Sequence, residues 1–276
     1  MRTKAQLALA VVEAHGDRPE VFVTEHVGHA RELTKAAVAR DMRLVIAWGG
    51  DGTINEVASA LAFDDVPLGI IPAGSGNGLA RELGVSRRPE QAIADALAAA
   101  PRPLDLGEIE GRYFLNIAGI GFDAHIAAQF ATATRRGFIG YAGITARALR
   151  SYVPMRYRIT SGGTHEEVRA VLVSIANSRQ FGNGARIAPG ACVDDGLLDL
   201  VVFEEQSRFR TVCSVPRLFN GTVERIRGCR IKRITEVTIE ADLPMTFHVD
   251  GEPVQGGTRL RARIHPGALL VAVKNS

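Results

Sequence analysis

The sequence predicts an α/β domain followed by a β-sandwich domain, and two observations lead to this fold class. Over the first hundred or so residues, helical segments alternate with short apolar strands, which is typical of a parallel sheet covered by helices. After this region, short strands follow one another between Gly, Asp and Asn turns, as in a sandwich. We therefore expect one domain at residues 1–101, to which residues 266–276 return, and a second domain at 102–265.

The expected elements follow from hydrophobic periodicity. In the first domain they are a helix at 2–14, a strand at 20–23, a helix at 29–40, a strand at 44–48, a helix at 54–61, a strand at 68–71, and helices at 79–83 and 89–100. In the second domain they are a hairpin of 106–109 with 113–117, strands at 155–160, 168–176, 197–203, 230–240, 245–249 and 259–264, and one helix at about 138–151. Residues 268–273 are apolar enough to rejoin a core.

The composition is typical of a globular enzyme and gives no indication of a nucleic-acid partner. With 46% hydrophobic and 23% charged residues in 276, the chain is long enough for two cores and unlike a disordered protein. A net charge of +3 does not indicate a nucleic-acid partner. Three cysteines without metal or disulfide spacing suggest reduced thiols in a cytoplasmic protein. We expect no transmembrane segment, and we interpret the first residues as an amphipathic helix rather than a signal peptide.

Two glycine-rich turns follow the strands expected at 44–48 and 68–71. The first reads Gly49-Gly50-Asp51-Gly52-Thr53 and the second Gly74-Ser75-Gly76-Asn77-Gly78, and each opens a helix. Exposed backbone amides and the start of a helix both attract anions. Parallel neighbouring strands would bring both turns to the carboxyl edge of one sheet, where α/β proteins bind ligands. These turns therefore predict a nucleotide phosphate site, although the second turn lacks the Lys-Ser/Thr ending of a Walker loop and the spacing of a dinucleotide fingerprint.

The polar residues of these turns each allow two interpretations. Asp51 would repel phosphate unless a divalent cation lies between them, which favours a Mg²⁺ role, but Asp is also common in Asx turns and helix caps. Thr53 and Asn55 are candidate ligands or first-turn capping residues. Ser75 and Asn77 offer a hydroxyl and an amide to a phosphate, or belong to an ordinary tight turn.

Acidic residues of the second domain are similarly ambiguous. Asp195-Gly196 and Asp250-Gly251 are strong turn signals, yet Asp195 with neighbouring carbonyls suits Mg²⁺. Glu252, on a tight turn, is a candidate to take a proton from an attacking hydroxyl. Asp105 and Asp123 are further candidates. The arginines and lysine between residues 208 and 233 form either a solvated face or a contact with an anionic membrane surface.

Together these motifs resemble the diacylglycerol kinase catalytic family, which includes bacterial lipid kinases and the sphingosine and ceramide kinases. The resemblance covers nearly the whole chain. The first motif is shared with NAD kinases, whereas the full set in this order is specific. The motifs are Gly49 to Thr53, Pro72 to Asn77, Asp105-Leu106-Gly107, Asn116 to Asp123, Asp195-Gly196-Leu197 and Asp250-Gly251-Glu252-Pro253.

The resemblance implies an α/β nucleotide-binding domain of the phosphofructokinase and NAD kinase type and a β-sandwich domain for a lipid substrate. It implies a phosphotransferase of lipid metabolism, including phospholipid biosynthesis, that transfers the γ-phosphoryl group of ATP to a lipid hydroxyl with Mg²⁺. Glu252 matches the general base, and Asp51 and Asp105 match carboxylates that work with the catalytic metal. Nucleotide-binding positions are Thr24, Gly49, Gly50, Asp51, Gly52, Thr53, Ile54, Asn55, Ser75 and Asn77, and a second Mg²⁺ site is Cys192, Asp195 and Leu197, with backbone carbonyls at Cys192 and Leu197.

Two departures from the family pattern leave alternatives open. The usual first strand and Asn-Pro-x-x-Gly loop are absent, which implies a truncated start or a protein that lacks one strand and binds ATP poorly. Ser75-Gly76-Asn77-Gly78 resembles the sphingosine kinase branch more than the bacterial diacylglycerol kinases, so the expected acceptor is diacylglycerol or a sphingoid-type lipid. The alternatives are an NAD kinase-like enzyme with a soluble substrate and a non-catalytic lipid- or nucleotide-binding relative.

The resemblance also bears on partners and location. A lipid acceptor implies a substrate at a membrane surface and a cytoplasmic protein with peripheral contact at the inner membrane face. Homodimers are common in the family, although the sequence identifies no interface.

Overall fold

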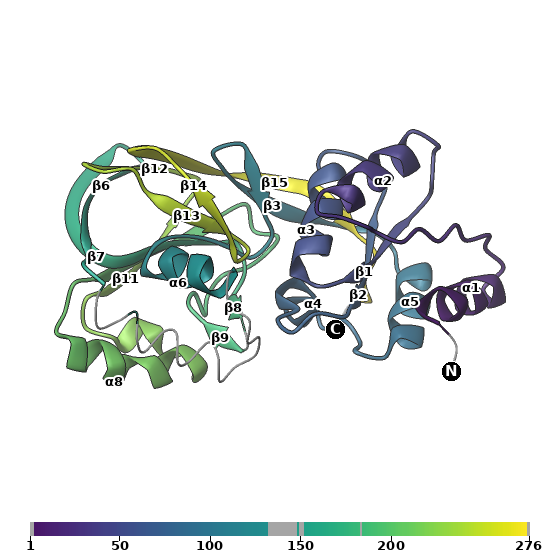
Figure 1. The fold of residues 1–276 in the computed structure, drawn as a ribbon, viewed down its shortest axis with the longest axis horizontal. Coiled ribbons are helices and arrows are strands. Elements are labelled where there is room, and N and C mark those ends of the chain that lie inside the picture. The colour runs from purple at the N-terminus through teal and green to yellow at the C-terminus, as the bar shows by residue number, and fades with distance from the viewer. Residues whose placement is uncertain (1–2, 132–147, 149–151, 183, 275–276) are drawn as a thin grey trace. The chain divides into compact units, whose positions relative to one another are not determined.

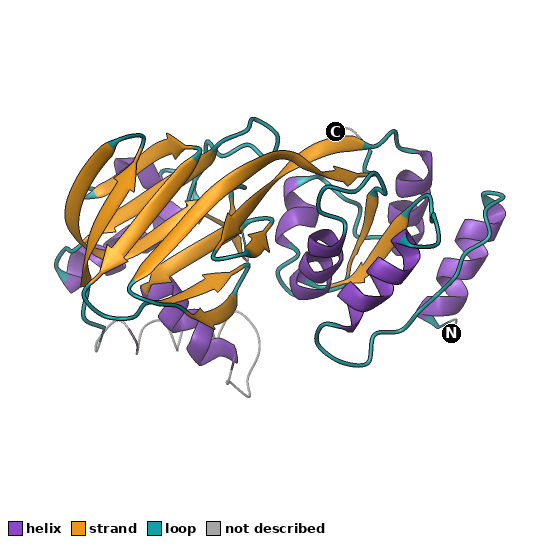
Figure 2. Ribbon diagram, turned by 90° about the horizontal axis from the view of Figure 1, so that it is seen from above, coloured by secondary structure: helices purple, strands orange, loops and turns teal. Residues whose placement is uncertain are grey.

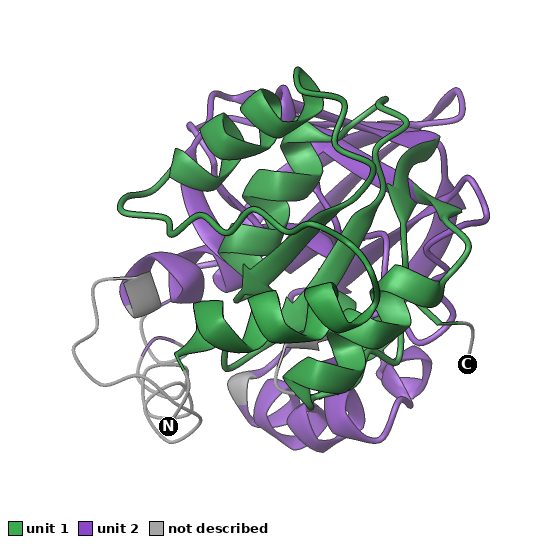
Figure 3. Ribbon diagram, turned by 90° about the vertical axis from the view of Figure 1, so that its right-hand side faces the viewer, with its two compact units in different colours: residues 1–104, 267–276 green, residues 105–266 purple. Residues whose placement is uncertain are grey.

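The computed structural model describes residues 3–131, 148, 152–182 and 184–274. The chain divides into two compact units, residues 1–104 with 267–276 and residues 105–266, which Figure 3 colours separately. Two strands, β3 (Arg102–Ile109) and β15 (Arg259–Val271), contribute residues to both units. Among the described residues, no helix is both long and apolar enough to cross a membrane.

The first unit is a parallel sheet with helices (Figure 1). Strands β1 and β2 pair in parallel from Val45 with Leu68 to Gly49 with Pro72, and the end of β15 joins β2 in parallel at Val271. Both glycine-rich turns therefore leave the sheet at the same edge, as the sequence predicted. The elements are α1 (Lys4–Ala14), α2 (His29–Val38), β1 (Val45–Gly49), α3 (Asp51–Ala60), β2 (Leu68–Pro72), α4 (Gly78–Glu82) and α5 (Pro89–Ala98).

Helices α1 and α5 cover part of this sheet. Helix α1 begins with a reciprocal capping box, in which the Thr3 hydroxyl accepts from the Gln6 amide and the Gln6 side chain accepts from the Thr3 amide. Its Val12 packs with Ile93 of α5 and Ile71 of β2 in one buried cluster. Burial of these apolar side chains, rather than intrinsic helix propensity, holds the short helices in place.

The strand predicted at 20–23 is wrong. Residues 17–25 form no regular element, and Val21, Phe22 and Val23 are exposed, Val23 by 74%. An apolar run forms a strand only where a neighbouring strand satisfies its backbone groups. Within the described residues, the ladders of β1 pair it with β2 alone, so this run has no such neighbour.

The second unit is built from antiparallel strands (Figure 2). Strand β7 is central, because β5, β6 and β10 all pair with it. Strand β12 links β6 to β15, β13 pairs with β5 and β14, and β10 pairs with β11. The remaining elements are β4 (Arg112–Phe114), β5 (Ile117–Gly121), α6 (Phe122–Ala131), β6 (Met155–Ser161), β7 (Thr164–Ala176), β8 (Gln180–Gly182), β9 (Ala185–Arg186), β10 (Leu198–Glu204), α8 (Arg208–Phe219), η1 (Val223–Arg225), β11 (Cys229–Ile234), β12 (Glu236–Ala241), β13 (Thr246–Val249) and β14 (Glu252–Gln255).

Alternating residues of these strands form the main core of the second unit. Tyr157 and Ile159 on β6, and Val237 and Ile239 on β12, point into the same buried cluster, while the residues between them are more exposed. This period of two is what a strand with one buried face requires.

Two strand predictions were wrong in extent. The run expected at 230–240 is two strands, β11 and β12, because the buried position moves from Ile234 to Val237 in a step of three. Such a shift turns the alternation to the other face, so each half pairs with different neighbours. Conversely, the separate runs at 259–264 and 268–273 belong largely to one strand, β15, which continues through Pro266 and Gly267.

Two helices of the second unit were not predicted as such. Helix α6 begins directly after β5, and α8 lies in the basic region that the sequence described only by charge. The helix expected at 138–151 falls almost entirely outside the described residues.

Candidate functional site

The two glycine-rich turns of the first unit are in direct backbone contact. The Ala73 amide donates to the Gly49 carbonyl at 2.8 Å, which continues the pairing of β1 and β2 into the turns. A Cβ atom on Gly74 would lie 2.7 Å from the Gly50 Cα, closer than real Cβ contacts allow. Glycine is therefore required for the turns to lie against each other, and their main chains form one surface.

The Asp51 carboxylate fastens the second turn to the first. Its Oδ2 accepts from the Asn77 amide at 2.8 Å and its Oδ1 from the Gly78 amide at 2.6 Å. Asn77 has a left-handed backbone (φ 53°) and is buried, and its side chain bonds both the amide and the carbonyl of Gly74. These bonds match the interpretation of Asp51 as a capping residue. The helix that it caps, however, is α4 and not its own helix α3.

A second carboxylate on α3, Glu56, was not singled out from the sequence. Its two oxygens accept from the amides of Gly28 at 2.8 Å and Ala30 at 3.1 Å, at the start of α2. Thr24, a predicted nucleotide ligand, lies exposed a few residues before this anchor. Through Glu56 and Asp51, helix α3 is thus hydrogen-bonded to the start of α2, which follows Thr24, and to the second glycine-rich turn. The available signal was an acidic side chain shortly after Thr53 on the same helix.

The start of α3 is suited to a phosphate. Gly50 is its N-cap residue and provides no side-chain cap, and first-turn amides have no partner within a helix. Thr53 lies beside Gly49, Ser75 is exposed, and Asn55 accepts from Ser59 at 3.3 Å. The residues present therefore fit a nucleotide phosphate held by main-chain amides.

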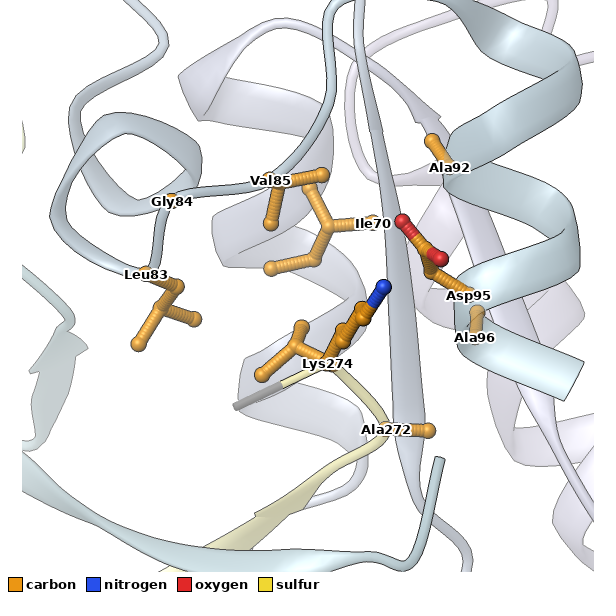
Figure 4. Close-up of a pocket in the computed structure, with 10 residues that line it drawn as sticks. Ile70, Leu83, Gly84, Val85, Ala92, Asp95, Ala96, Ala272 and Lys274 are labelled. Atoms are coloured by element: carbon orange, nitrogen blue, oxygen red, sulfur yellow. The ribbon is translucent and has the colours of Figure 1, made fainter. Parts of the chain in front are cut away.

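A small hollow in the first unit lies elsewhere (Figure 4). Its walls come from β2, the end of α4, α5 and the C-terminal residues, and Figure 4 shows the Asp95 and Lys274 side chains facing it. None of the predicted nucleotide ligands lines it, and its lining residues are apolar apart from Asp95 and Lys274. The hollow is therefore separate from the phosphate site predicted at the glycine-rich turns.

In the second unit, Asp105 is joined to the loop that carries the predicted second Mg²⁺ site. Asp105 is buried, its Oδ2 accepts from the Gly196 amide at 2.7 Å, and its own amide donates to the Val193 carbonyl at 2.8 Å. The Asn177 side chain also donates to the Asp105 carbonyl at 3.0 Å. The side chain and the main chain of Asp105 thus hold together residues that are far apart in sequence.

The oxygen atoms at residues 192–197 are of the kind that binds Mg²⁺, but the Asp195 carboxylate already has other partners. Carboxylate and carbonyl oxygens are the ligands that this ion prefers. Asp195 accepts from the Leu197 amide at 3.1 Å through Oδ1, and its Oδ2 forms an ion pair with Arg233. The Cys192 thiol donates to Asp194 at 2.9 Å, and this hydrogen bond together with burial raises the pKa of Cys192. A cation here would share or replace the Arg233 contact.

Glu252 is the first residue of β14 and is exposed. The turn before it is a two-residue hairpin with positive φ at Asp250 (48°) and Gly251 (92°), the pattern of a type I′ turn. The Asp250 carboxylate accepts from three successive amides, those of Leu115 at 2.9 Å, Asn116 at 2.9 Å and Ile117 at 3.0 Å. The turn interpretation is correct, and the turn presents Glu252 on a well-anchored backbone.

A buried polar network lies beneath the same turn. His248 accepts from the Gly251 amide at 3.2 Å through Nδ1, so its Nε2 carries the proton, and Nε2 lies 3.4 Å from Asp123 Oδ2. Ser174 donates to the same Asp123 oxygen at 2.9 Å. A Cβ on Gly119 would lie 2.0 Å from that oxygen, so the network requires glycine there. The sequence indicated Asp123 but not His248.

Two tyrosines border this network and remain protonated. Burial raises the pKa of Tyr152 to about 12, and burial together with Tyr152 raises that of Tyr157 as well. The nearby Asp123 carboxylate acts in the same direction on both. They are neutral phenols rather than bases.

One further cluster was not expected from the sequence. Ligand atoms of His26, His29 and Glu32 lie within 4.8 Å of one another. The two imidazole rings are stacked with centroids 4.6 Å apart, and His29 Nδ1 accepts from the Glu25 amide. That bond puts the ring proton of His29 on Nε2, so in this arrangement His29 presents no lone pair to a metal ion.

Comparisons with known proteins agree with these motifs. The family described as the diacylglycerol kinase catalytic domain matches residues 1–109, and the YegS C-terminal NAD kinase beta sandwich-like domain matches residues 116–273. The chain belongs to the diacylglycerol kinase catalytic family of lipid kinases. Relatives in this lipid kinase family include a "Probable lipid kinase YegS-like" of Pseudomonas fluorescens, 32% identical over 98% of this chain and 91% of the relative. Another is a "Probable lipid kinase YegS" of Escherichia coli, 30% identical over 95% and 88%.

Solved structures confirm the predicted fold class. A diacylglycerol kinase from Bacillus anthracis has a TM-score of 0.74 at 21% identity, covering 97% of this chain and 90% of that one. An NAD kinase from Archaeoglobus fulgidus in complex with ATP has a TM-score of 0.60 at 12% identity, covering 100% and 91%. The α/β first domain and the sandwich-like second domain are thus those expected from the sequence.

Proposed function

We propose that this chain transfers the γ-phosphoryl group of ATP to a lipid hydroxyl, with Glu252 as the general base. The observation that carries this proposal is the turn before Glu252. It is fixed by three amide bonds to Asp250 and by the His248 network, and the residue that follows it, Glu252, is exposed. Proton abstraction from a substrate requires a carboxylate on a fixed backbone at the protein surface.

We propose that the first unit holds the ATP phosphates through main-chain amides. In this proposal Asp51 and Glu56 are not phosphate ligands themselves but keep the turns and the Thr24 segment in register. Gly50 and Gly74 leave the main chain open to the phosphates. Ser75, Asn55 and Thr53 add side-chain donors, which suits in-line phosphoryl transfer, where positioning is most of the catalysis.

Mg²⁺ would neutralise charge on the transferred group when bound, as in phosphoryl transfer generally. Asp105, Asp195 and the carbonyls of Cys192 and Leu197 are the residues proposed to hold such ions. The protein's own part is to keep these oxygens together, which the bond from Gly196 to Asp105 does.

The proposed acceptor is a long-chain lipid alcohol, either a diacylglycerol or a sphingoid-type base. The Ser75-Gly76-Asn77-Gly78 turn supports the second through its likeness to the sphingosine kinase branch, and the YegS-like relatives support a lipid acceptor without naming it. An NAD kinase-like activity is the competing possibility, and the fold likeness does not discriminate between the two.

The test is phosphate transfer from labelled ATP with Mg²⁺ to a panel of acceptors. The panel includes diacylglycerol, a sphingoid base, ceramide, phosphatidylglycerol and NAD. We expect a labelled lipid with the native chain and with Glu167→Gln, an exposed strand glutamate of the same unit, but not with Glu252→Gln. Labelled NAD without labelled lipid would overturn the lipid assignment, and equal turnover by Glu252→Gln would overturn the base assignment.

A further inference from the structure

Helix α8 turns its apolar face outward. Phe209 is 78% exposed, and Val212, Val215 and Phe219 are also exposed. With 3.6 residues per turn, Phe209, Val212, Pro216 and Phe219 lie along one side of the helix. The usual arrangement buries such a stripe against the core, so this helix presents an apolar strip to its surroundings.

The inward face of α8 is more polar than its outward face. The half-buried residues of the helix are Thr211, Ser214, Arg217 and Leu218. The Ser214 hydroxyl donates to the Arg210 carbonyl at 2.8 Å and the Thr211 hydroxyl to the Ser207 carbonyl at 3.4 Å, so both are satisfied inside the helix. Leu218 packs against the buried cluster of Val223 and Ile226. Since α8 is held by this inner face, the outer face is not needed for folding.

The outward strip is bordered by positive charge. Residues 207–228 contain five arginines and one glutamate, an excess of four positive charges, whereas the whole chain carries only +3. Arg210 and Arg217 lie about two turns apart at the border of the strip, where Arg210 is exposed and the half-buried Arg217 donates to the Arg225 carbonyl. Arg225 and Arg227 follow the helix and are exposed. The rest of the chain is therefore close to neutral, and the basic character of the protein is concentrated around this strip.

We propose that the outer face of α8 docks on an anionic lipid bilayer, with Phe209 and Phe219 in the headgroup region and the flanking arginines on lipid phosphates. A helix of this length is too short to cross a bilayer and suits one lying in its surface. Arginine extends its apolar stem along such a surface while its guanidinium meets phosphate. The combination of aromatic residues and arginines matches a bilayer in charge as well as in polarity.

This inference deepens the proposed function, because it supplies the surface by which a lipid kinase reaches an acceptor in a membrane. It rests on the proposed function only for the reason why the protein would bind a membrane. The four apolar side chains and the local charge are independent of any catalytic residue.

The experiment measures binding of the full chain to vesicles of phosphatidylcholine alone and of phosphatidylcholine with phosphatidylglycerol. We expect binding to the anionic vesicles that weakens with salt. The double variant Phe209→Ser/Phe219→Ser should lose about ten-fold or more in partition, and Arg210→Gln/Arg227→Gln should lose the preference for anionic lipid. Leu243→Ser, another exposed apolar residue of the same unit, should bind like the native chain.

Circular dichroism of each variant and turnover with a short-chain acceptor dissolved as monomers separate docking from folding and catalysis. Loss of vesicle binding with native turnover on the monomeric acceptor supports the proposal. Equal vesicle binding by the Phe209/Phe219 variant, or no vesicle binding by the native chain, overturns it and leaves a protein partner as the occupant of the strip. Binding that depends on Phe209 and Phe219 in a chain without kinase turnover supports the docking surface and overturns the kinase proposal instead.

Discussion

Each of the two units contains an aspartate that anchors a turn, but the turn presents a different kind of group in each unit. In each, an aspartate in a glycine turn accepts from backbone amides of a distant segment, Asp51 from Asn77 and Gly78, and Asp250 from Leu115 to Ile117. In the first unit these bonds bring main-chain amides to the surface. In the second they bring a side chain, Glu252, to the surface. The aspartate of a motif therefore need not be its reactive group.

The energetic reason is that hydrogen bonds from amides to a carboxylate are strong when partly shielded from water. Each contributes about 1.5–3 kcal/mol where the acceptor is charged. Such bonds fix a loop without a hydrophobic core of its own. If anchoring residues and reactive residues are separate, substitutions at the two kinds of residue should differ in their effects on turnover and on stability.

The largest effect is expected from Glu252→Gln. Removing a general base lowers turnover by about 10²–10⁴-fold, while the melting temperature and ATP affinity should hardly change because the side chain is exposed and its turn is anchored by Asp250. Steady-state kinetics with the lipid acceptor, together with ATP titration calorimetry, measure both. The matched control is Glu167→Gln, and a Glu252→Gln variant that also melts early would mean that Glu252 anchors rather than reacts.

Asp250→Ala should affect both stability and turnover. Three amides lose their acceptor, so the free energy of unfolding should fall by about 3 kcal/mol or more, and Glu252 loses its fixed backbone. Urea unfolding and turnover at saturating ATP are the measurements. Asp242→Ala, an exposed aspartate in the turn before β13, is the control. Native stability in Asp250→Ala would contradict the anchoring role.

Asp51→Ala should destabilise the chain by about 2–3 kcal/mol, since two amides lose their acceptor, and it should weaken ATP binding because the second turn is released. Fluorescence-detected unfolding and nucleotide titration check this, with exposed Asp65→Ala as the control in the same unit. If ATP binding survives while Mg²⁺-dependent turnover alone is lost, Asp51 is a metal carboxylate and the comparison between the two units fails.

Much of this architecture followed from local sequence. The Gly49 to Thr53 and Gly74 to Gly78 turns, the parallel pairing of their strands and the Asp250-Gly251 turn are readable because turn chemistry and strand periodicity act over a few residues. The family and fold class followed from the order of such motifs. The site roles of Glu252, Asp105 and Asp195 remain predictions.

What the sequence did not reveal depends on partners far along the chain. The bonds from Leu115, Asn116 and Ile117 to Asp250 span 133 to 135 residues, and no local pattern announces them. His248 was missed for the same reason, since its significance comes from Asp123. Helix α8 was missed because its apolar face points outward, and the run at 20–23 was misread because an apolar run does not reveal whether a neighbouring strand exists.

Arg233→Gln should raise Mg²⁺ affinity several-fold, by about 1 kcal/mol, because the guanidinium no longer competes for Asp195 Oδ2. Titration calorimetry with Mg²⁺ alone measures this without turnover. Arg230→Gln removes the same charge from the same strand, where the arginine pairs with Glu166 and Glu204 instead, and it should leave the affinity unchanged. Equal affinities in the native chain and Arg233→Gln would mean that the cation binds away from Asp195.

The smallest effect concerns Asp199, a buried residue on β10 outside the anchored turns. Burial, and then the Glu224 carboxylate, raise the pKa of Asp199 above its usual range. Because the folded state binds this proton more tightly than the unfolded chain, ionised Asp199 costs stability at neutral pH, and that cost disappears as pH falls through the raised pKa toward the ordinary value of about 4. Asp199→Asn should therefore raise the melting temperature by a few degrees at pH 7 and make no difference below about pH 4. Glu224→Gln removes only the weaker cause and should give a smaller rise over the same pH range. A lower melting temperature for Asp199→Asn at pH 7 would show that Asp199, like Asp51 and Asp250, is an anchor whose hydrogen bonds outweigh its burial.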